Sequence, residues 1–162
     1  GIPQRRTRLL IMCVRQDVFK KYGFPEEPEA SFKNAHRSIE WAIGDLIDVI
    51  DNSIPNQGDY FAASKAKKGN GQGDESNHKD KPAYTIRANP KSRVQFHYSL
   101  GRRLTVRECA RIQTFPDNFR FKFSKTVNIS QIGNAVPPVL AYQVAKSVAN
   151  YLNRIGEEND EC

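Results

Sequence analysis

The chain has 162 residues, of which 38% are hydrophobic, and this is enough for one domain with a modest core. No apolar run approaches the roughly twenty residues that span a bilayer, and the N-terminus lacks the layout of a signal peptide, so we expect a cytoplasmic protein with no membrane partner. The 3 cysteines and 3 histidines are scattered, without the spacing of a disulfide framework or a zinc site, so we predict no bound metal.

Positive charge is concentrated in two segments of the chain. The net charge is +7, and residues 91–125 hold nine basic against two acidic residues, while residues 1–21 hold six against one. Residues 22–60 oppose them with eight acidic and two basic residues. Such clustering is expected of a surface that meets a phosphate backbone, although charge alone would equally describe a solvated face.

Residues 1–14 consist of a basic segment followed by an apolar run. Residues 9–14 are apolar and bounded by arginines, which predicts a strand covered on both faces, as in a parallel sheet. Before that run, strand alternation would place Arg6 and Arg8 on one side and Arg5 and Thr7 on the other. One strand cannot form a sheet, so we expect its partner strands on other residues and interpret the chain as a fragment or a subunit.

An amphipathic helix and a polar loop follow. Ser38 is a good N-cap, and apolar residues recur at helical spacing, so we predict a helix across residues 38–50. Residues 52–81 are rich in Gly, Ser, Asn and Lys, which predicts a flexible loop that could order on DNA. Its Gly-x-Gly-x-Gly spacing does not indicate a nucleotide site, because no apolar strand leads into it and no helical pattern follows.

Two short β patterns occupy residues 82–98. The β-formers at residues 84–86, and the alternation of Val94, Phe96 and Tyr98 with polar residues, predict two strands. Polar side chains on one face of such a ribbon could bind base edges in a major groove, arginine on guanine being the commonest pairing. The candidate DNA contacts are Arg87, Lys91, Arg93 and Gln95, together with Arg102 and Arg103 farther along the basic segment.

Residues 102–126 contain a capped helix and an alternating segment. Thr105 and Glu108 have the spacing of a capping box, which starts a helix, and Pro116 stops it. The phenylalanines at 119, 121 and 123 alternate with basic residues, which predicts a half-buried edge strand, with base stacking by the rings as the alternative.

The last patterned stretch is residues 128–152. Gly133 and Asn134 can make a tight turn, and the two prolines at 137 and 138 suit the first turn of a helix whose apolar side continues over residues 139–152. A turn that feeds a helix N-terminus leaves amides unpaired and suits a polar ligand, although an ordinary strand-to-helix connection would look the same.

Three of these stretches resemble sequence motifs of the DNA cytosine-5 methyltransferases. Residues 1–8 are similar to the eighth motif, whose pattern Gln-x-Arg-x-Arg falls on Gln4, Arg6 and Arg8. Residues 102–116 resemble the ninth motif and residues 131–138 the tenth. The three occur in family order and bracket the whole chain, which makes the signal strong.

The resemblance implies a mixed α/β fold in three parts. Residues 1–17 would supply a strand of a Rossmann-like catalytic domain, residues 18–124 a target-recognition domain of irregular, β-rich structure, and residues 125–162 the tenth motif and a helix that returns to the catalytic domain.

The resemblance also implies roles for single residues. Arg8 would lie in the active site and hold the flipped cytosine through its carbonyl oxygen, while Arg6 would serve either the same site or a phosphate contact. Gly133, Asn134 and Ala135 would lie against S-adenosylmethionine.

The catalytic motifs of this family are absent from the 162 residues. No Pro-Cys nucleophile, no glutamate of the family's catalytic motif and no Phe-x-Gly-x-Gly donor loop occurs in the right setting. Because covalent catalysis needs an activated nucleophile, we predict no methyl transfer by this chain alone and expect an N-terminal catalytic half, in the same polypeptide or in a separate subunit.

Our interpretation is the C-terminal portion of a DNA cytosine-5 methyltransferase of a bacterial restriction-modification system. It would bind one site in double-stranded DNA and support extrusion of the cytosine, because the target carbon is unreachable within the base stack. Two alternatives stay open: a stand-alone sequence-specific DNA-binding or regulatory module without catalysis, and a fragment of an RNA cytosine-5 methyltransferase.

Overall fold

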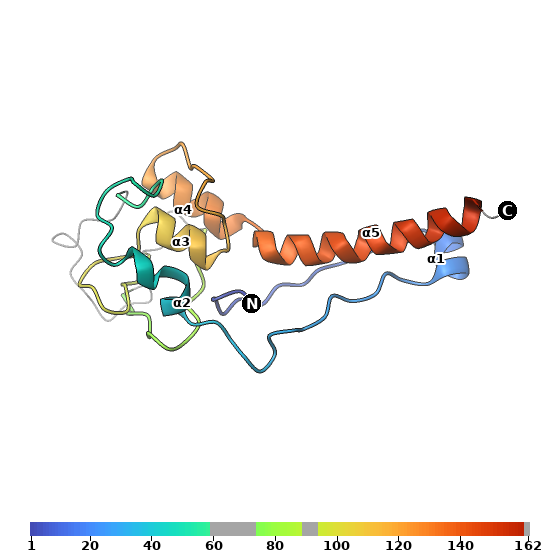
Figure 1. Cartoon of the computed structure of the whole chain (residues 1–162), viewed down its shortest axis with the longest axis horizontal. Coiled ribbons are helices and arrows are strands. Elements are labelled where there is room, and N and C mark those ends of the chain that lie inside the picture. Colours follow the sequence, from blue (N-terminus) through green and yellow to red (C-terminus); the bar gives the residue numbers. More distant parts are fainter. Residues whose placement is uncertain (59–73, 89–93, 161–162) are drawn as a thin grey trace.

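A long C-terminal helix projects from a helical head in the computed structural model, which describes residues 1–58, 74–88 and 94–160 (Figure 1). The head contains α2 (Ile39–Ile43), α3 (Val106–Ile112) and α4 (Lys125–Asn134), and a 3-10 turn, η1 (Gly44–Leu46), follows α2 directly. The projecting helix is α5 (Pro138–Asp160), and the short α1 (Gln16–Tyr22) lies against its far end. Neither α5 nor any other helix in the described part of the chain is both long and apolar enough to cross a membrane.

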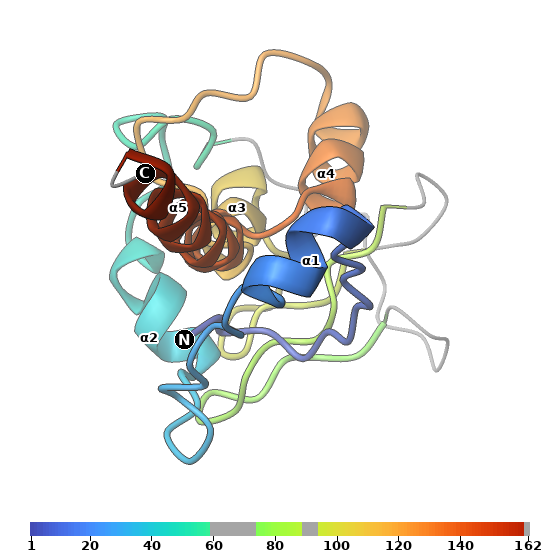
Figure 2. The same ribbon diagram turned by 90° about the vertical axis from the view of Figure 1, so that its right-hand side faces the viewer.

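Helix α3 lies between α2 and α4 and forms the centre of the core (Figure 2). Every residue of α3 except Arg111 is buried. Aliphatic side chains from the neighbouring elements pack around it, among them Ile39, Ile43, Leu46, Leu104, Ile129 and Ile132. Removal of this apolar surface from water is the main stabilising term of the head.

The capping box predicted for α3 is confirmed. The Thr105 hydroxyl accepts from the Glu108 amide at 2.9 Å, and the Thr105 amide donates to Glu108 Oε2 at 2.8 Å. The predicted N-cap of Ser38 is also confirmed, since its hydroxyl accepts from the Trp41 amide at 3.2 Å. The helix after Ser38 is shorter than predicted, because it ends at Ile43 and tightens into η1. The C-terminal helix starts at Pro138 as expected and extends to Asp160.

The predicted β-rich recognition domain is not present in residues 18–58, 74–88 and 94–124. The described residues form only isolated bridges, which pair Gln4 with Ala83, Ser76 with Phe96 and Phe96 with Arg103. The strands predicted at 84–86 and 94–98 are therefore wrong, and the edge strand predicted around Phe121 is absent as well. Side chains take the place of a strand ladder there: Asn56 exchanges two hydrogen bonds of 2.9 Å with the main chain of Phe121.

The predicted strand at residues 9–14 is likewise not formed. Its side chains are exposed, with 83% of Leu9 and 79% of Ile11 accessible to solvent. The described part of the chain offers no neighbouring strand to this segment, and an unpaired strand has no hydrogen-bond partners for its main chain.

A buried arginine fixes the irregular segments to α3. The Arg107 side chain has no exposed surface, and its guanidinium donates to the carbonyls of Pro55 (2.7 Å), Pro116 (3.0 Å) and Phe119 (2.5 Å). Burial lowers the pKa of Arg107, while Asp117, 3.9 Å away, opposes this effect. One guanidinium therefore satisfies three carbonyls that no sheet or helix serves.

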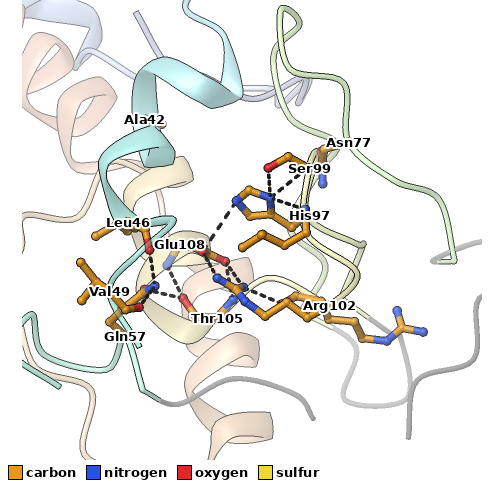
Figure 3. A network of polar contacts seen from close by, with 12 residues as sticks. Ala42, Leu46, Val49, Gln57, Asn77, His97, Ser99, Arg102, Thr105 and Glu108 are labelled. Atoms are coloured by element: carbon orange, nitrogen blue, oxygen red, sulfur yellow. Dashed lines mark hydrogen bonds and ion pairs between the residues drawn. The ribbon is translucent and has the colours of Figure 1, made fainter. Parts of the chain in front are cut away.

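Glu108 is the centre of a buried polar network on the other side of α3 (Figure 3). Arg102 donates to both carboxylate oxygens, at 2.9 and 2.8 Å. The ring nitrogen Nδ1 of His97 accepts from the amides of Ser99 (3.1 Å) and Leu100 (3.2 Å), so its proton lies on Nε2, 3.9 Å from Glu108. The network thus holds the loop after residue 97 through a neutral histidine.

Helix α4 approaches the chain at residues 87–88 so closely that only glycine fits at 133. A Cβ built on Gly133 would lie 2.6 Å from the amide nitrogen of Ala88 and 2.7 Å from the carbonyl carbon of Arg87. Gly133 and Asn134 are the last residues of α4, so the tight turn predicted for them is wrong. The glycine serves close packing between a helix and a neighbouring main chain.

We predict that Gly133→Ala lowers the free energy of unfolding by about 1–3 kcal/mol, because the methyl group collides with main-chain atoms that cannot rotate away. The matched control is Gly156→Ala in α5, where a Cβ meets nothing within 4 Å. That change should stabilise by up to about 1 kcal/mol through helix propensity. Urea unfolding of both variants measures the difference, and equal midpoints would contradict the packing account.

A second prediction concerns acid stability. Burial lowers the pKa of His97, with Arg102 acting in the same direction and Glu108 in the opposite one. The folded state therefore binds fewer protons than the unfolded state, whose histidine titrates near pH ~6.5, so stability is full above that pH and falls as the pH drops below it. We expect this loss to shrink in His97→Asn, whose side-chain oxygen can still accept the two amides.

Urea unfolding between pH 7.5 and 5.5 tests the histidine prediction. The control is His78→Asn, which removes an exposed histidine outside the Glu108 network. An identical pH dependence in the wild type and in His97→Asn would show that His97 does not govern acid stability.

Candidate functional site

The three motif stretches meet at one place, which we call the motif junction and define as Gln4, Arg6, Gln113, Gly133 and Ala135. The Gln4 amide donates to Gln113 Oε1 at 2.5 Å, and its oxygen accepts from the Ile86 amide at 3.0 Å. The Gln113 amide in turn donates to the Ala135 carbonyl at 2.7 Å. Two side-chain amides thus join residues 1–8, the end of α3 and the connection between α4 and α5.

Arg6 lies inside the junction. Its guanidinium donates to the carbonyls of Ile86 at 2.8 Å and Gly133 at 2.5 Å. Burial, and then the charge of Arg8, lowers the pKa of Arg6. The main chain beside it is held by a bridge, in which the Arg5 amide donates to the Ala83 carbonyl at 2.9 Å. Arg6 therefore holds the start of the chain against α4.

Arg8 lies at the exposed edge of the same segment. Its guanidinium donates to the carbonyl of the adjacent Thr7 at 2.7 Å, and its side chain faces solvent. Arg6 and Arg8 thus differ within this structure: Arg6 bonds to carbonyls that are distant in sequence, whereas Arg8 bonds to its neighbour and is exposed.

The three residues predicted to contact a cofactor differ in their exposure to solvent. Gly133 is buried against residues 87–88, whereas Asn134 is exposed and Ala135 half-buried. Asn134 and Ala135 lie at one end of a hollow of about 500 Å³ along α4, whose other lining residues are Thr126, Val127, Ser130 and Gln131. This lining combines amide and hydroxyl groups with apolar side chains, as small-molecule sites do.

The start of α5 is already bonded. The Thr114 hydroxyl accepts from the Val139 amide at 3.2 Å, and Pro137 and Pro138 have no amide hydrogen. The first turn of α5 therefore has fewer unpaired amides for a polar ligand than we expected for a helix N-terminus.

The candidate DNA contacts differ in where the structure places them. Lys91 and Arg93 lie outside the described residues, and Arg87 is half-buried next to Gly133. Gln95, Arg102 and Arg103 bond to the protein itself. Arg102 is paired with Glu108, and Arg103 is buried and donates to Asp74 at 2.6 Å and to the Val94 carbonyl. Gln95 is buried and donates to the Thr85 carbonyl at 3.4 Å.

These three side chains serve the fold because buried carboxylates and carbonyls need donors. From the sequence, Arg102 and Arg103 are included in the basic surface, because the sequence does not show that the buried carboxylates of Glu108 and Asp74 lie beside them.

The two cysteines in the described part of the chain, Cys13 and Cys109, lie in different environments. Cys109 is buried in α3, and burial together with the charge of Glu108 raises the pKa of its thiol well above the usual range. Cys13 is exposed in the segment after Arg8. A thiol that stays protonated is a poor nucleophile, so Cys109 is a core residue.

Sequence reasoning did not single out two residues that position this site, Gln113 of the junction and the adjacent Thr114. Gln113 is a fully buried amide, and Thr114 has a left-handed backbone with φ of 67°. For Gln113, the sequence does contain a signal of a buried polar role, because this polar residue lies on the apolar face of a predicted helix. The sequence carries no signal for the conformation of Thr114, because β-branched residues rarely adopt it.

A family model, described as C-5 cytosine-specific DNA methylase, matches residues 51–150. Type II methyltransferase M.PspPI from Psychrobacter sp. (strain TA137) is 32% identical over 94% of this chain and 44% of its own length. M.NgoPII from Neisseria gonorrhoeae is 30% identical over 95% of this chain and 53% of its own. M1.HphI from Haemophilus parahaemolyticus is 46% identical over 44% of this chain and 18% of its own.

The chain thus spans about half or less of the length of these relatives. The matched residues include α3, α4 and the first part of α5, together with Gln113, Gly133 and Ala135 of the motif junction. The family model and the relatives together show that the chain belongs to the C-5 cytosine-specific DNA methylases.

Proposed function

We propose that the chain is the C-terminal portion of a DNA cytosine-5 methyltransferase, which binds double-stranded DNA and transfers a methyl group to cytosine together with a catalytic N-terminal half. The observation that carries this proposal is the motif junction. It joins the segment that presents Arg8 to the segment that presents Asn134, through Gln4, Gln113 and Ala135. Base and donor must meet within bonding distance for transfer, so their two binding segments need a fixed relation.

Arg8 is proposed to bind the extruded cytosine. Its side chain is accessible, and a guanidinium is always charged, so it can donate hydrogen bonds to a carbonyl oxygen at any physiological pH. Arg6 is proposed to position Arg8, because its own donors are bonded to the carbonyls of Ile86 and Gly133.

Asn134 and Ala135 are proposed to form one wall of the site for S-adenosylmethionine. The hollow along α4 supports this role, since it places the Asn134 amide beside apolar side chains in a space of about 500 Å³. When bound, this cofactor supplies the methyl group. The chain's own residues would hold it in place and exclude water on this side.

The missing catalytic half is proposed to cover residues 9–12 and the exposed apolar side chains of α5. Leu9 and Ile11 are mostly exposed, and so are Tyr142 (66%) and Leu152 (58%) of α5. Exposed apolar surface of this extent indicates a protein partner. It favours the methyltransferase over a stand-alone DNA-binding module, which would bury these residues within its own core.

DNA contact is proposed for four basic residues. Arg5 is exposed and Arg87 is half-buried next to Gly133, while Lys91 and Arg93 follow in sequence and lie outside the described residues. Contacts to phosphates would fix the orientation of the duplex, and contacts to base edges would provide specificity.

The proposal is tested by mixing this chain with an N-terminal half that contains the Pro-Cys motif and measuring transfer of a labelled methyl group to DNA. We expect no transfer by the chain alone and transfer by the mixture. In the mixture, Arg8→Ala should lower the rate of transfer by about 100-fold, the loss expected for a donor to the reacting group, with a much smaller effect on DNA affinity.

The matched control is Arg5→Ala, which removes an equal charge from another exposed position of the same segment. It should weaken DNA binding and transfer together. An equal loss of both quantities in Arg8→Ala would place Arg8 on the DNA backbone, and specific DNA binding without transfer in any mixture would favour the stand-alone module.

A further prediction concerns the cofactor. Asn134→Ala should weaken S-adenosylmethionine binding by the mixture about tenfold, the effect of one or two lost hydrogen bonds. Calorimetric titration measures the affinity, and Asn150→Ala, an exposed asparagine of α5 outside this hollow, is the control. An unchanged affinity for S-adenosylmethionine would contradict a cofactor-binding role for Asn134.

A further inference from the structure

The connection between α4 and α5 is held from both ends by two consecutive residues. Gln113 donates to the Ala135 carbonyl at 2.7 Å, and the Thr114 hydroxyl accepts from the Val139 amide at 3.2 Å. Residues 135–137 join the end of α4 to the start of α5, and both contacts come from the two residues that directly follow α3. The end of α3 therefore determines where this connection lies.

Gln113 links the connection to the opposite segment of the site. Its oxygen accepts from Gln4 while its nitrogen donates to Ala135, so both halves of one amide are in use. Gln4 is itself fixed, because its oxygen accepts from the Ile86 amide. The Gln113 side chain is fully buried, so water does not compete for these bonds.

Thr114 adopts an unfavourable backbone conformation to make its bond. With φ of 67°, the backbone of this β-branched residue is strained. Glycine would relieve the strain but would lose the hydroxyl that holds Val139. A threonine at this position therefore combines a strained backbone with a hydroxyl that holds the start of α5 in place.

We propose that Gln113 and Thr114 are positioning residues that fix the donor-binding segment, residues 134–139, relative to the base-binding segment, residues 4–8. This inference rests on the proposed function for its catalytic consequence. Its structural part, that these two side chains hold the connection, stands on the contacts alone.

The test uses Gln113→Glu, which keeps an oxygen for Gln4 and replaces the donor to Ala135 with a second oxygen. The matched control is Gln57→Glu. Gln57 is equally buried, donates to the carbonyls of Leu46 (3.2 Å) and Val49 (3.0 Å), and accepts from the Thr105 hydroxyl at 2.8 Å. Both changes place a carboxylate against carbonyls in the head, but only one touches the connection.

In the mixture with the Pro-Cys half, we expect Gln113→Glu to lower kcat/KM for S-adenosylmethionine at least tenfold, with DNA affinity within threefold of the wild type. Gln57→Glu should change kcat/KM by less than threefold once both variants are assayed below their unfolding temperatures. Equal losses in the two variants would overturn the inference, because they would reflect general destabilisation.

Hydrogen exchange of the 162-residue chain provides a readout that needs no activity. Gln113→Glu and Thr114→Val should raise the exchange rate of amides in residues 135–141 at least tenfold. Thr114→Ser, which retains the hydroxyl, and Gln57→Glu should leave it unchanged. Unchanged exchange in Gln113→Glu and Thr114→Val would overturn the structural part of the inference.

The two assays separate failure of the inference from failure of the proposed function. A wild-type mixture that transfers no methyl group would contradict the proposed function, and the exchange experiment would still decide whether Gln113 and Thr114 hold the connection. An active wild type with equal behaviour of Gln113→Glu and Gln57→Glu would leave the proposed function intact and refute the inference.

Discussion

Hydrogen bonds from buried side chains to main-chain carbonyls fix the irregular segments of this molecule around its apolar core. Arg107 satisfies three carbonyls of the chain that surrounds α3, and Gln57 satisfies two more. Unpaired carbonyls in a core cost free energy, so each of these side chains allows irregular main chain to be buried where a sheet would otherwise be needed. The site depends on the same device, because Arg6 and Gln113 also act on carbonyls.

This constraint explains which sequence predictions hold. Local signals with their own geometry succeed: the Thr105–Glu108 capping box starts α3, Ser38 caps α2, and the proline at 138 begins α5. These depend on residues a few positions apart. The β patterns fail because alternation predicts a strand only when a neighbouring strand provides the ladder, and around Phe121 the Asn56 side chain takes that place.

The candidate site is predictable in part for the same reason. The spacing of Gln4, Arg6 and Arg8 predicts that the two arginines share a side of a strand, which is not formed, and it gives no sign that Arg6 bonds to the carbonyls of Ile86 and Gly133, far away in sequence. The sequence pattern predicts Gly133 as a turn residue, whereas in the structure it lies in α4 in close contact with the main chain of residues 87–88. A count of basic residues likewise assigns Arg103 to a DNA-binding surface, because its ion-pair partner Asp74 is 29 residues earlier and cannot be recognised from the sequence.

The far end of α5 carries further long-range bonds. Tyr151 donates to the Gly23 carbonyl at 2.8 Å across 128 positions of sequence, and Arg154 donates to the Tyr22 carbonyl at 3.0 Å. The Ser147 hydroxyl, about one turn earlier on α5, donates to the Glu26 carbonyl. Removing residues 151–160 would break the bonds to Tyr22 and Gly23 while leaving the α3 core untouched, so the position of α1 depends on side chains that lie far later in the sequence.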